Sequence, residues 1–405
     1  MNTQNTPVHI SLWHRSFWAL VLANMFLSMS VTALIPILPL WVMQTLHSSA
    51  LEAGVAMFAC CVGMFSIGGF CSYLVQRFRR NHVCLYSVFC TIICIGLLYF
   101  FTHYMENIPI WIVWMIRLLT GAAFGLSQMV LSSTLIIDKT ESFQRTEANH
   151  VAAWFRRFAL SLGPATAIPV YIHYGFDTVL AMLAAYAFVA MVLIRSVRFP
   201  FKTPDESVHV YSLDRFFLPQ SKWLFINMLL ITSMLGLLLS AVADAWFYGV
   251  MMIGFFLAII AEKFMFADAD IKSEAVVGLI LIGAASLLML TRDLPIVHRI
   301  VPVFVGFGFG IIGSRFMLFF IKLSHHCQRG TSHSSFFLTW ELGIGIGLLA
   351  GYGLFYGNVA ALLKTILMLT VVSLLLHVFV THPWYMANKN RYAGGIYYQI
   401  AHLFK

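Results

Sequence analysis

Twelve stretches of mostly apolar residues follow one another along the 405-residue chain. Each has the roughly 20 residues that a helix needs to cross a bilayer. None alternates apolar and polar residues as the strands of a membrane β-barrel do, and a helix closes its own backbone hydrogen bonds in lipid. The chain is also 60% hydrophobic and only 10% charged, unlike soluble domains. The sequence therefore predicts an all-α integral membrane protein with spans over residues 16–43, 53–75, 82–102, 108–137, 151–172, 178–196, 223–242, 245–261, 275–291, 296–323, 334–356 and 360–381.

Lysine and arginine are distributed unevenly between the two sides of the membrane. Alternate connections hold most of them, including the cluster Arg77, Arg79 and Arg80, whereas the other connections hold little beyond Arg292 and Arg299. Because cytoplasmic connections carry the excess of Lys and Arg, we expect a multi-pass protein of the cytoplasmic (inner) membrane with both termini in the cytoplasm. The formal net charge of +9 then reflects topology, and no nucleic-acid partner is expected.

No motif for catalysis or for a cofactor is visible. Glycine-rich runs such as residues 306–313 lie inside spans, without the strand that precedes a nucleotide-binding loop. His325, His326, Cys327 and His333 fall near one another, but their spacing is not typical of zinc sites. Six of the seven cysteines lie in apolar segments, where small buried fillers are expected rather than disulfides. The expectation is a protein that is no enzyme and has no metal and no cofactor.

The chain divides into two halves that repeat one another. Residues 121–128 (GAAFGLSQ) align without gaps with residues 308–315 (GFGIIGSR) at an offset of 187, and QRF at 76–78 aligns with EKF at 262–264 at an offset of 186. Two anchors at nearly one offset favour a duplication of six helices. The longest connection is charged and contains three prolines, as a linker does. The expected domains are a six-helix bundle over 1–196, a cytoplasmic linker over 197–222, a second bundle over 223–382 and a cytoplasmic tail over 383–405.

This arrangement resembles the major facilitator superfamily of secondary transporters, and local motifs support the resemblance. After its second helix the family has Gly-x-x-x-Asp-Arg-x-Gly-Arg-Arg. The chain reads SYLVQRFRRN, which keeps Arg77 and Arg80 and has Gln76 in place of the Asp. In the fourth helix the proton-coupled branch has Arg-x-x-x-Gly, which Arg117 and Gly121 match.

In the fifth helix, antiporters of that family carry a glycine motif that ends in Gly-Pro, and Gly163 and Pro164 match this end. The resemblance, closest to the drug/proton antiporter branch, implies two pseudo-symmetric six-helix bundles around a midplane cavity and alternating access. It also implies proton coupling, and it favours export slightly over uptake.

Arg117 lies in the middle of the fourth span. It is about nine residues, or roughly 13 Å, from the outer end, which is near the centre of a core about 30 Å thick. A guanidinium at that depth is costly on a lipid face, so we place Arg117 toward the bundle interior. There it could bind an anionic solute or tune a carboxylate used for proton coupling. The structural alternative is an arginine satisfied by carbonyls and polar groups of the first span, such as Asn24 or Ser28.

Arg315 and Glu341 are expected at similar depth on neighbouring antiparallel helices, where each would make the other tolerable. They could be a static pair, or Glu341 could be the proton-coupling carboxylate. The remaining candidates for hydrogen bonding in the cavity are Gln128, Asn24 and Asn227. Arg156 and Arg157 of the fifth span either snorkel to the interface, or one of them faces the cytoplasmic vestibule and attracts anions.

The preferred hypothesis is a monomeric, proton-coupled secondary transporter of a small organic solute, with membrane lipid around it. The cationic excess within the membrane favours an anionic or amphiphilic solute. Two other classes stay open, namely a transporter fold that acts as a sensor or assembly protein without flux, and an integral membrane enzyme that acts on lipids.

Overall fold

The computed structural model describes residues 11–105, 107–199, 208–266, 272–292, 294–325 and 328–393. This part of the chain is almost entirely helical and contains no strand. The first half forms α1 (Arg15–Thr32), α2 (Leu34–Thr45), α3 (Ala50–Gly68), α4 (Cys71–Arg77), α5 (Arg80–Tyr104), α6 (Ile110–Val130), α7 (Ile136–Asp138) and α8 (Arg145–Ser196). The second half forms α9 (Lys222–Ser240), α10 (Ala245–Phe264), α11 (Ser273–Thr291), α12 (Pro295–Leu323), α13 (Arg329–Leu354), α14 (Val359–Leu376) and α15 (His382–Ala393).

The twelve predicted spans are confirmed. Eleven helical runs of the described chain are long and apolar enough to cross a membrane. One of them, α8, has 52 residues, more than twice what one crossing needs. Its helical geometry is interrupted at Gly175, where φ is +80°. Glycine tolerates this conformation because it has no Cβ, so Gly175 divides α8 into the fifth and sixth spans.

The first span is broken at Ala33, between α1 and α2. Pro36 and Pro39 follow the break, and neither can donate a backbone hydrogen bond to the residue four positions earlier. The last span runs through a π-helical turn at His377–Thr381 into α15. The predicted tail therefore begins as helix, and its residues 394–405 lie outside the described residues.

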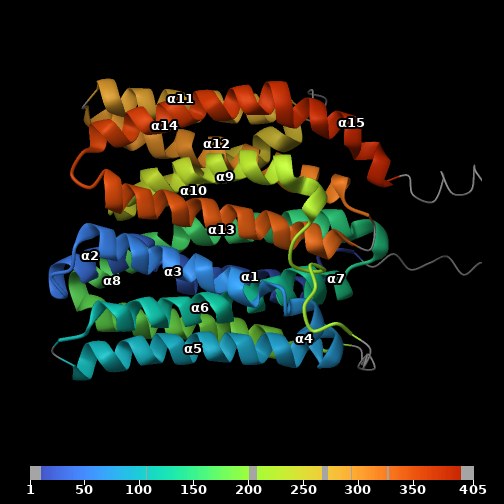
Figure 1. The fold of residues 1–405 in the computed structure, drawn as a ribbon, viewed down its shortest axis with the longest axis horizontal. Helices are drawn as coiled ribbons and strands as arrows, with labels where there is room; N and C mark the ends of the chain where they lie inside the picture. The colour runs from blue at the N-terminus through green and yellow to red at the C-terminus, as the bar shows by residue number, and fades with distance from the viewer. Residues whose placement is uncertain are drawn as a thin grey trace, which may run out of the picture.

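The helices form two bundles that lie side by side (Figure 1). In the first bundle α1 packs against α8, and α3 and α5 pack against α6. In the second bundle α9 packs against α13, and α10 and α11 pack against α12. The bundles meet along α3 and α13, and also where α8 contacts α10.

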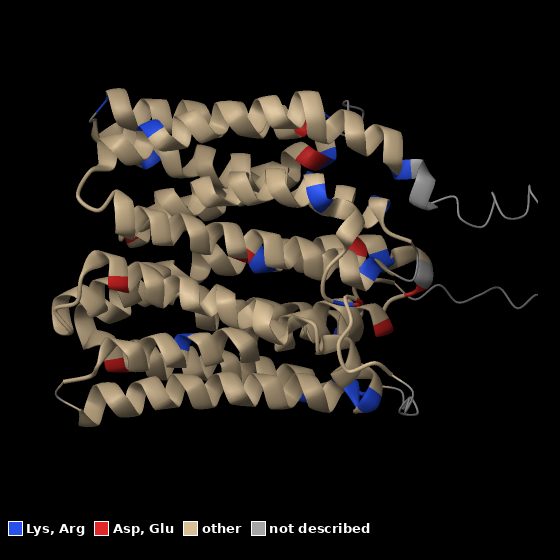
Figure 2. Cartoon of the chain, in the orientation of Figure 1, with Lys and Arg blue, Asp and Glu red and all other residues tan. Residues whose placement is uncertain are grey.

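Charged side chains gather at one end of the molecule (Figure 2). That end also holds the described part of the linker, so we call it the linker end. Between the two ends the helices carry few charges, and large apolar side chains such as Phe89, Phe100 and Phe379 are exposed on the outside. An apolar exterior of this kind is what lipid contact requires, and it makes the charges inside the bundles conspicuous.

Candidate functional site

Arg117 and Glu341 come from different bundles and line one small cavity between them. The cavity has a volume of about 30 Å³, which is room for one or two water molecules. Its other lining residues are mostly apolar and come from α1, α2, α3 and α13, together with Cys60 and Cys61. Arg117 is 2% exposed, so the predicted inward position of this arginine is what the structure has.

Two glycines bring the helix of Arg117 close to α3. A Cβ added to Gly121 would overlap the carbonyl oxygen of Cys60, and one added to Gly63 would overlap that of Leu118. Only residues without a Cβ allow this approach, as in other membrane helix pairs with small residues at the contact. Since Gly121 follows Arg117 by about one helical turn, the Arg-x-x-x-Gly spacing seats the arginine beside α3.

Two buried nitrogens of Arg117, Nε and Nη1, have no hydrogen-bond partner in the described chain. The nearby polar groups of α1 do not donate to or accept from these nitrogens, and Asn24 Oδ1 is also without a partner. Asn24 Nδ2 donates to the carbonyl of Ala152 at 2.8 Å, and Ser28 Oγ donates to the carbonyl of Asn24 at 2.8 Å. Gln128 Nε2 donates to Ser28 Oγ at 3.0 Å. No hydrogen bond joins Arg117 Nε or Nη1 to Asn24 or Ser28 in the described chain.

Glu341 reaches the cavity from the middle of α13. Among the described residues, no cation forms an ion pair with its carboxylate. Arg156 interacts with it electrostatically from farther away. The Cys61 thiol donates to the Glu341 carbonyl at 3.3 Å and so ties α3 to α13 at this level. Glu341, which is partly exposed, thus lines the same small cavity as Arg117 without direct neutralisation by a described cation.

Arg315 pairs with Glu274 of α11 and not with Glu341. Its Nε lies 2.7 Å from Glu274 Oε2, and a second contact joins Nη2 to Oε1. The predicted pair with Glu341 is wrong because equal depth on neighbouring helices does not fix which face a side chain occupies. Arg315 points from α12 toward α11, whereas α13 presents Glu341 to the cavity.

Asn227, Gly163 and Pro164 do not line the cavity. Asn227 is fully buried inside the second bundle, where its Nδ2 donates to Thr381 Oγ1 at 3.1 Å. A Cβ on Gly163 would lie 2.8 Å from Thr32 Oγ1, so this glycine lets α8 pack against the break between α1 and α2. Pro164 follows it within α8.

At the linker end, the loop motif after the second span is tied to its own bundle. Arg80 Nη1 donates to Asp138 Oδ2 of α7 at 2.5 Å. Gln76 Nε2 donates to Ser72 Oγ at 2.8 Å. Arg77 is the partly buried last residue of α4.

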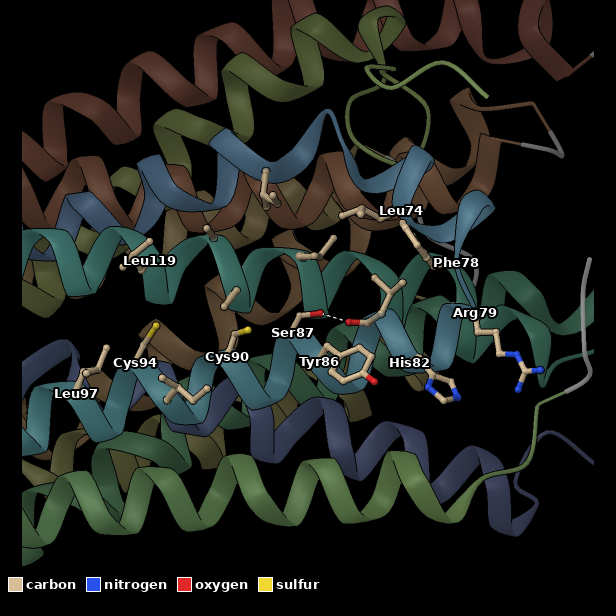
Figure 3. A pocket seen from close by; sticks show the side chains of 16 residues that line it. Leu74, Phe78, Arg79, His82, Tyr86, Ser87, Cys90, Cys94, Leu97 and Leu119 are labelled. Carbon is tan, nitrogen blue, oxygen red and sulfur yellow. Dashed lines mark hydrogen bonds between the residues drawn. The ribbon is translucent and has the colours of Figure 1, made fainter. Parts of the chain in front are cut away.

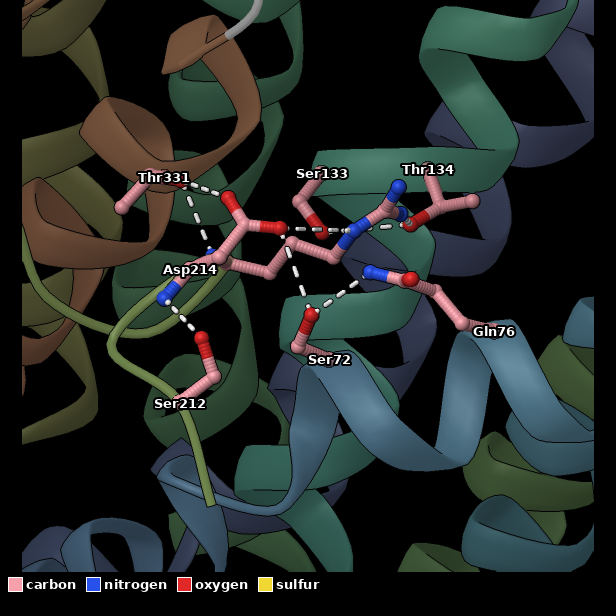
Figure 4. A network of polar contacts seen from close by, with 8 residues as sticks. Ser72, Gln76, Ser133, Thr134, Ser212, Asp214 and Thr331 are labelled. Atoms are coloured by element: carbon pink, nitrogen blue, oxygen red, sulfur yellow. Dashed lines mark hydrogen bonds and ion pairs between the residues drawn. The ribbon is translucent and has the colours of Figure 1, made fainter. Parts of the chain in front are cut away.

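Asp214 of the linker joins the two bundles (Figure 4). Its carboxylate accepts hydrogen bonds from Ser72 Oγ of α4 at 3.3 Å and from Thr331 Oγ1 of α13 at 2.9 Å. The neighbouring Arg215 donates through its backbone N–H to Thr331 Oγ1 at 2.9 Å, and through Nη1 to Thr134 Oγ1 at 2.7 Å. The linker therefore supplies a carboxylate beside Gln76, the position where the family motif has an aspartate.

Sequence reasoning missed the depth of Arg156 and Arg157. They were expected to snorkel, but they are 5% and 2% exposed and lie between the bundles. The adjacent pair of arginines inside an apolar run was the available signal.

A polar bridge between the bundles was also missed. His150 Nε2 of α8 lies 2.5 Å from Ser314 Oγ, which donates to Glu262 Oε1 at 2.7 Å. His150 and Glu262 themselves are 3.2 Å apart. This bridge connects the first bundle to α10 and α12 of the second.

The outer surface of the first bundle carries a larger hollow (Figure 3). It has a volume of about 850 Å³ and is lined mainly by apolar side chains of α3, α4, α5 and α6, with Arg79 and His82 toward the linker end. Because it opens outward and holds no buried charge, it is a lipid-facing groove rather than part of the central site.

Comparison with known proteins is consistent with this architecture. Residues 20–348 match the family model of the Major Facilitator Superfamily. No curated protein sequence matches the chain. Three solved structures share its fold at low sequence identity.

The transporter PepTSo of the POT family is 12% identical, with a TM-score of 0.68 over 93% of this chain and 99% of that one. The human organic anion transporter MFSD10 (TETRAN) is 12% identical, with a TM-score of 0.65 over 90% and 99%. The nucleoside transporter NupG is 13% identical, with a TM-score of 0.64 over 91% and 99%. Because the family model covers most of the spans and both bundles, the chain belongs to the Major Facilitator Superfamily and is a multi-pass membrane transporter of small molecules, not an enzyme.

Proposed function

We propose that this transporter couples the movement of a small organic solute, anionic or amphiphilic, to protons across the cytoplasmic membrane, as an antiporter that favours export. The observation that carries the proposal is that Glu341 and Arg117, from different bundles, line one small cavity. In this proposal the linker end and both termini are cytoplasmic, as the Lys and Arg distribution favours.

The small cavity is the place where Glu341 would exchange a proton during transport. In the present structure Glu341 is partly exposed to a space with room for one or two waters, and no described cation forms an ion pair with it. In the proposal, Glu341 carries a proton in one state of the cycle and releases it when the cavity opens to more water. Arg117 supplies a fixed positive charge that can stabilise either the ionised Glu341 or an anionic solute.

The contacts at the linker end would hold the closed state. Asp214 links Ser72 and Thr331 across the bundles, and the Arg80–Asp138 pair holds the loop that carries the family motif. Opening of this end would break the Asp214 contacts, while Arg80 and Arg77 would move with the first bundle. The hinge for rocking would be the break between α1 and α2, where Gly163 packs.

The proposal is tested with purified protein in liposomes. A solute is first selected from a metabolite collection by its stabilisation of the detergent-purified protein against heat, since ligand binding favours the folded state. Liposomes that are acidic inside should then accumulate it in exchange for protons, and Glu341→Gln should abolish this response. Glu147→Gln, which removes an exposed carboxylate near the start of α8, is the matched control. Accumulation that ignores the pH gradient would refute coupling, and binding without any flux would favour a sensor.

A further inference from the structure

Arg156 and Arg157 are two buried cations that no described group neutralises directly. Three nitrogens of Arg157 (Nε, Nη1 and Nη2) and Nη1 of Arg156 have no hydrogen-bond partner. No described carboxylate forms an ion pair with either arginine. Glu341 and Glu262 interact with them only electrostatically, from beyond ion-pair distance. Buried guanidinium groups normally bind carboxylates or phosphates, so this pair lacks its usual partner.

Aromatic rings enclose both guanidinium groups. The Arg157 guanidinium carbon lies 4.2 Å from the ring centroid of Trp154 and 5.8 Å from that of Trp340. The Arg156 guanidinium carbon lies 4.6 Å from the ring centroid of Phe337. Contact with ring faces offsets part of the lost hydration, but it does not satisfy the N–H groups that point past the rings. The two guanidinium groups therefore lie among flat, apolar rings, and several of their N–H groups have no acceptor.

On α12, Gly313 has no side chain and so leaves room for Arg157 and Trp340. A Cβ added to Gly313 would lie 2.9 Å from Arg157 Nε and 2.7 Å from the Trp340 ring. Two more buried polar side chains, on α8 and α13, are without hydrogen-bond partners. His333 of α13 is 1% exposed and Asn149 of α8 is fully buried, and neither has a hydrogen bond at either of its polar side-chain atoms.

Arg156 contacts Phe337 and Arg157 contacts Trp340 across the two bundles, and His333 interacts electrostatically with both arginines. Asn149 precedes Arg156 by about two turns of α8, and His333 precedes Phe337 by about one turn of α13. The unsatisfied groups therefore converge at the interface that must open and close if the bundles rock.

We propose that the transported solute is an aromatic carboxylic acid, whose carboxylate is held by Arg156 and Arg157. The planar guanidinium fork of Arg157 matches a carboxylate in bidentate geometry. The ring of the solute packs among Trp154, Trp340 and Phe337 in place of their present contacts with the arginines. The assignment rests on the proposed transport function and names its solute class, but the binding step does not depend on proton coupling.

The test measures equilibrium binding by titration calorimetry on the full-length protein in detergent. The probes are benzoate, 2-naphthoate and indole-3-acetate, each paired with the neutral alcohol and the amine of the same ring. At least one acid should bind about tenfold more tightly than its alcohol, as a charge-assisted hydrogen bond implies, and the amines should bind most weakly. If none of the acids binds better than its alcohol, the proposal is overturned.

Substitutions of Arg156 and Arg157 test whether the acid binds at these two residues. Arg157→Gln should weaken binding of the acid about tenfold or more and leave the alcohol unaffected, and Arg156→Gln should act in the same direction. Arg157→Lys keeps the charge without the fork, so it should fall between the wild type and Arg157→Gln, and it carries the test if the Gln variants do not purify as folded protein. Arg195→Gln, at the exposed far end of α8, is the control. Unchanged binding in Arg157→Lys and Arg157→Gln, or an equal loss in Arg195→Gln, would contradict the proposed site.

Glu341→Gln separates this proposal from the proposed coupling. It should still bind the acids, even though it should not respond to a pH gradient. Selective acid binding with no pH-driven flux in the wild type would therefore refute coupling and keep the site. Coupled flux of some other solute without acid binding would refute the site and keep coupling.

Discussion

Replacing Arg315 by Met would leave Glu274 as a buried carboxylate without a cation. Glu274 is 1% exposed, and both of its oxygens contact Arg315. Removing one partner of a buried ion pair costs about 3–5 kcal/mol. We therefore expect Arg315→Met to lower the free energy of unfolding by about that amount, and Glu274→Met to lower it similarly because Arg315 would then be left unpaired.

The double variant Arg315→Met/Glu274→Met removes both charges. A buried pair replaced by apolar side chains of similar volume is often neutral in stability, so the double variant should regain most of the loss. The free energies come from reversible unfolding in mixed detergent micelles followed by circular dichroism, and the double-mutant cycle gives the coupling between the two residues.

A second double-mutant cycle, with Arg315→Met and Glu341→Gln, tests the alternative in which Arg315 pairs with Glu341. The effects of these two substitutions should add, because Glu341 is not a partner of Arg315. Strong coupling of Arg315 to Glu341, together with additivity toward Glu274, would refute the arrangement of α11, α12 and α13 described here.

Three further predictions concern the cavity and the linker end. Arg117→Lys should slow solute flux in liposomes about tenfold while membrane insertion stays normal, because an ammonium group cannot reproduce the guanidinium geometry. Normal flux in this variant would show that Arg117 has only a structural role. Gly121→Leu should lower the thermal midpoint of the purified protein, because any Cβ there meets the α3 backbone; an unchanged midpoint would contradict that contact. Asp214→Asn should speed maleimide labelling of the fully buried Cys71, measured by peptide mass spectrometry. The effect should be modest, about 1 kcal/mol or less, because the Asp214 side chain is 45% exposed, and Asp177→Asn in another partly exposed ion pair should leave the labelling rate unchanged.

The spans and the inward position of Arg117 were predictable because each depends on one stretch of sequence. A run of about 20 apolar residues is sufficient to indicate a crossing, and counting residues from the end of the fourth span gives the depth of Arg117. Gly121 entered only as part of the motif, and its close approach to α3 was not predicted.

The ion-pair partner of Arg315 could not be predicted from the sequence in the same way. Counting gives depth but not direction, and α12 is buried on nearly every side. No apolar face therefore distinguishes the side toward α11 from the side toward α13. Choosing between Glu274 and Glu341 requires the packing of three helices, which a single sequence does not encode locally.

Arg156 and Arg157 were misplaced because the start of their helix was misjudged. The sequence predicted a start at residue 151, but α8 begins at Arg145. Five of the six earlier residues are polar, so hydropathy excluded the segment although it is helical. With that extension Arg156 lies about three turns into the helix, too deep to reach water. Asp214 was missed for a different reason, since the path of a linker across two bundles leaves no periodic pattern in the sequence.

The central claim is that Glu341 exchanges a proton during transport. The most direct measurement places a pH-sensitive dye inside liposomes that contain the protein and adds outside the solute selected by thermal stabilisation, without an imposed gradient. Solute entry should then raise the internal pH as protons leave, Glu341→Gln should show no such change, and liposomes without protein correct for passive entry of a weak acid. An internal pH that stays constant in the wild type while the solute enters, or an equal change in Glu341→Gln, would contradict the claim.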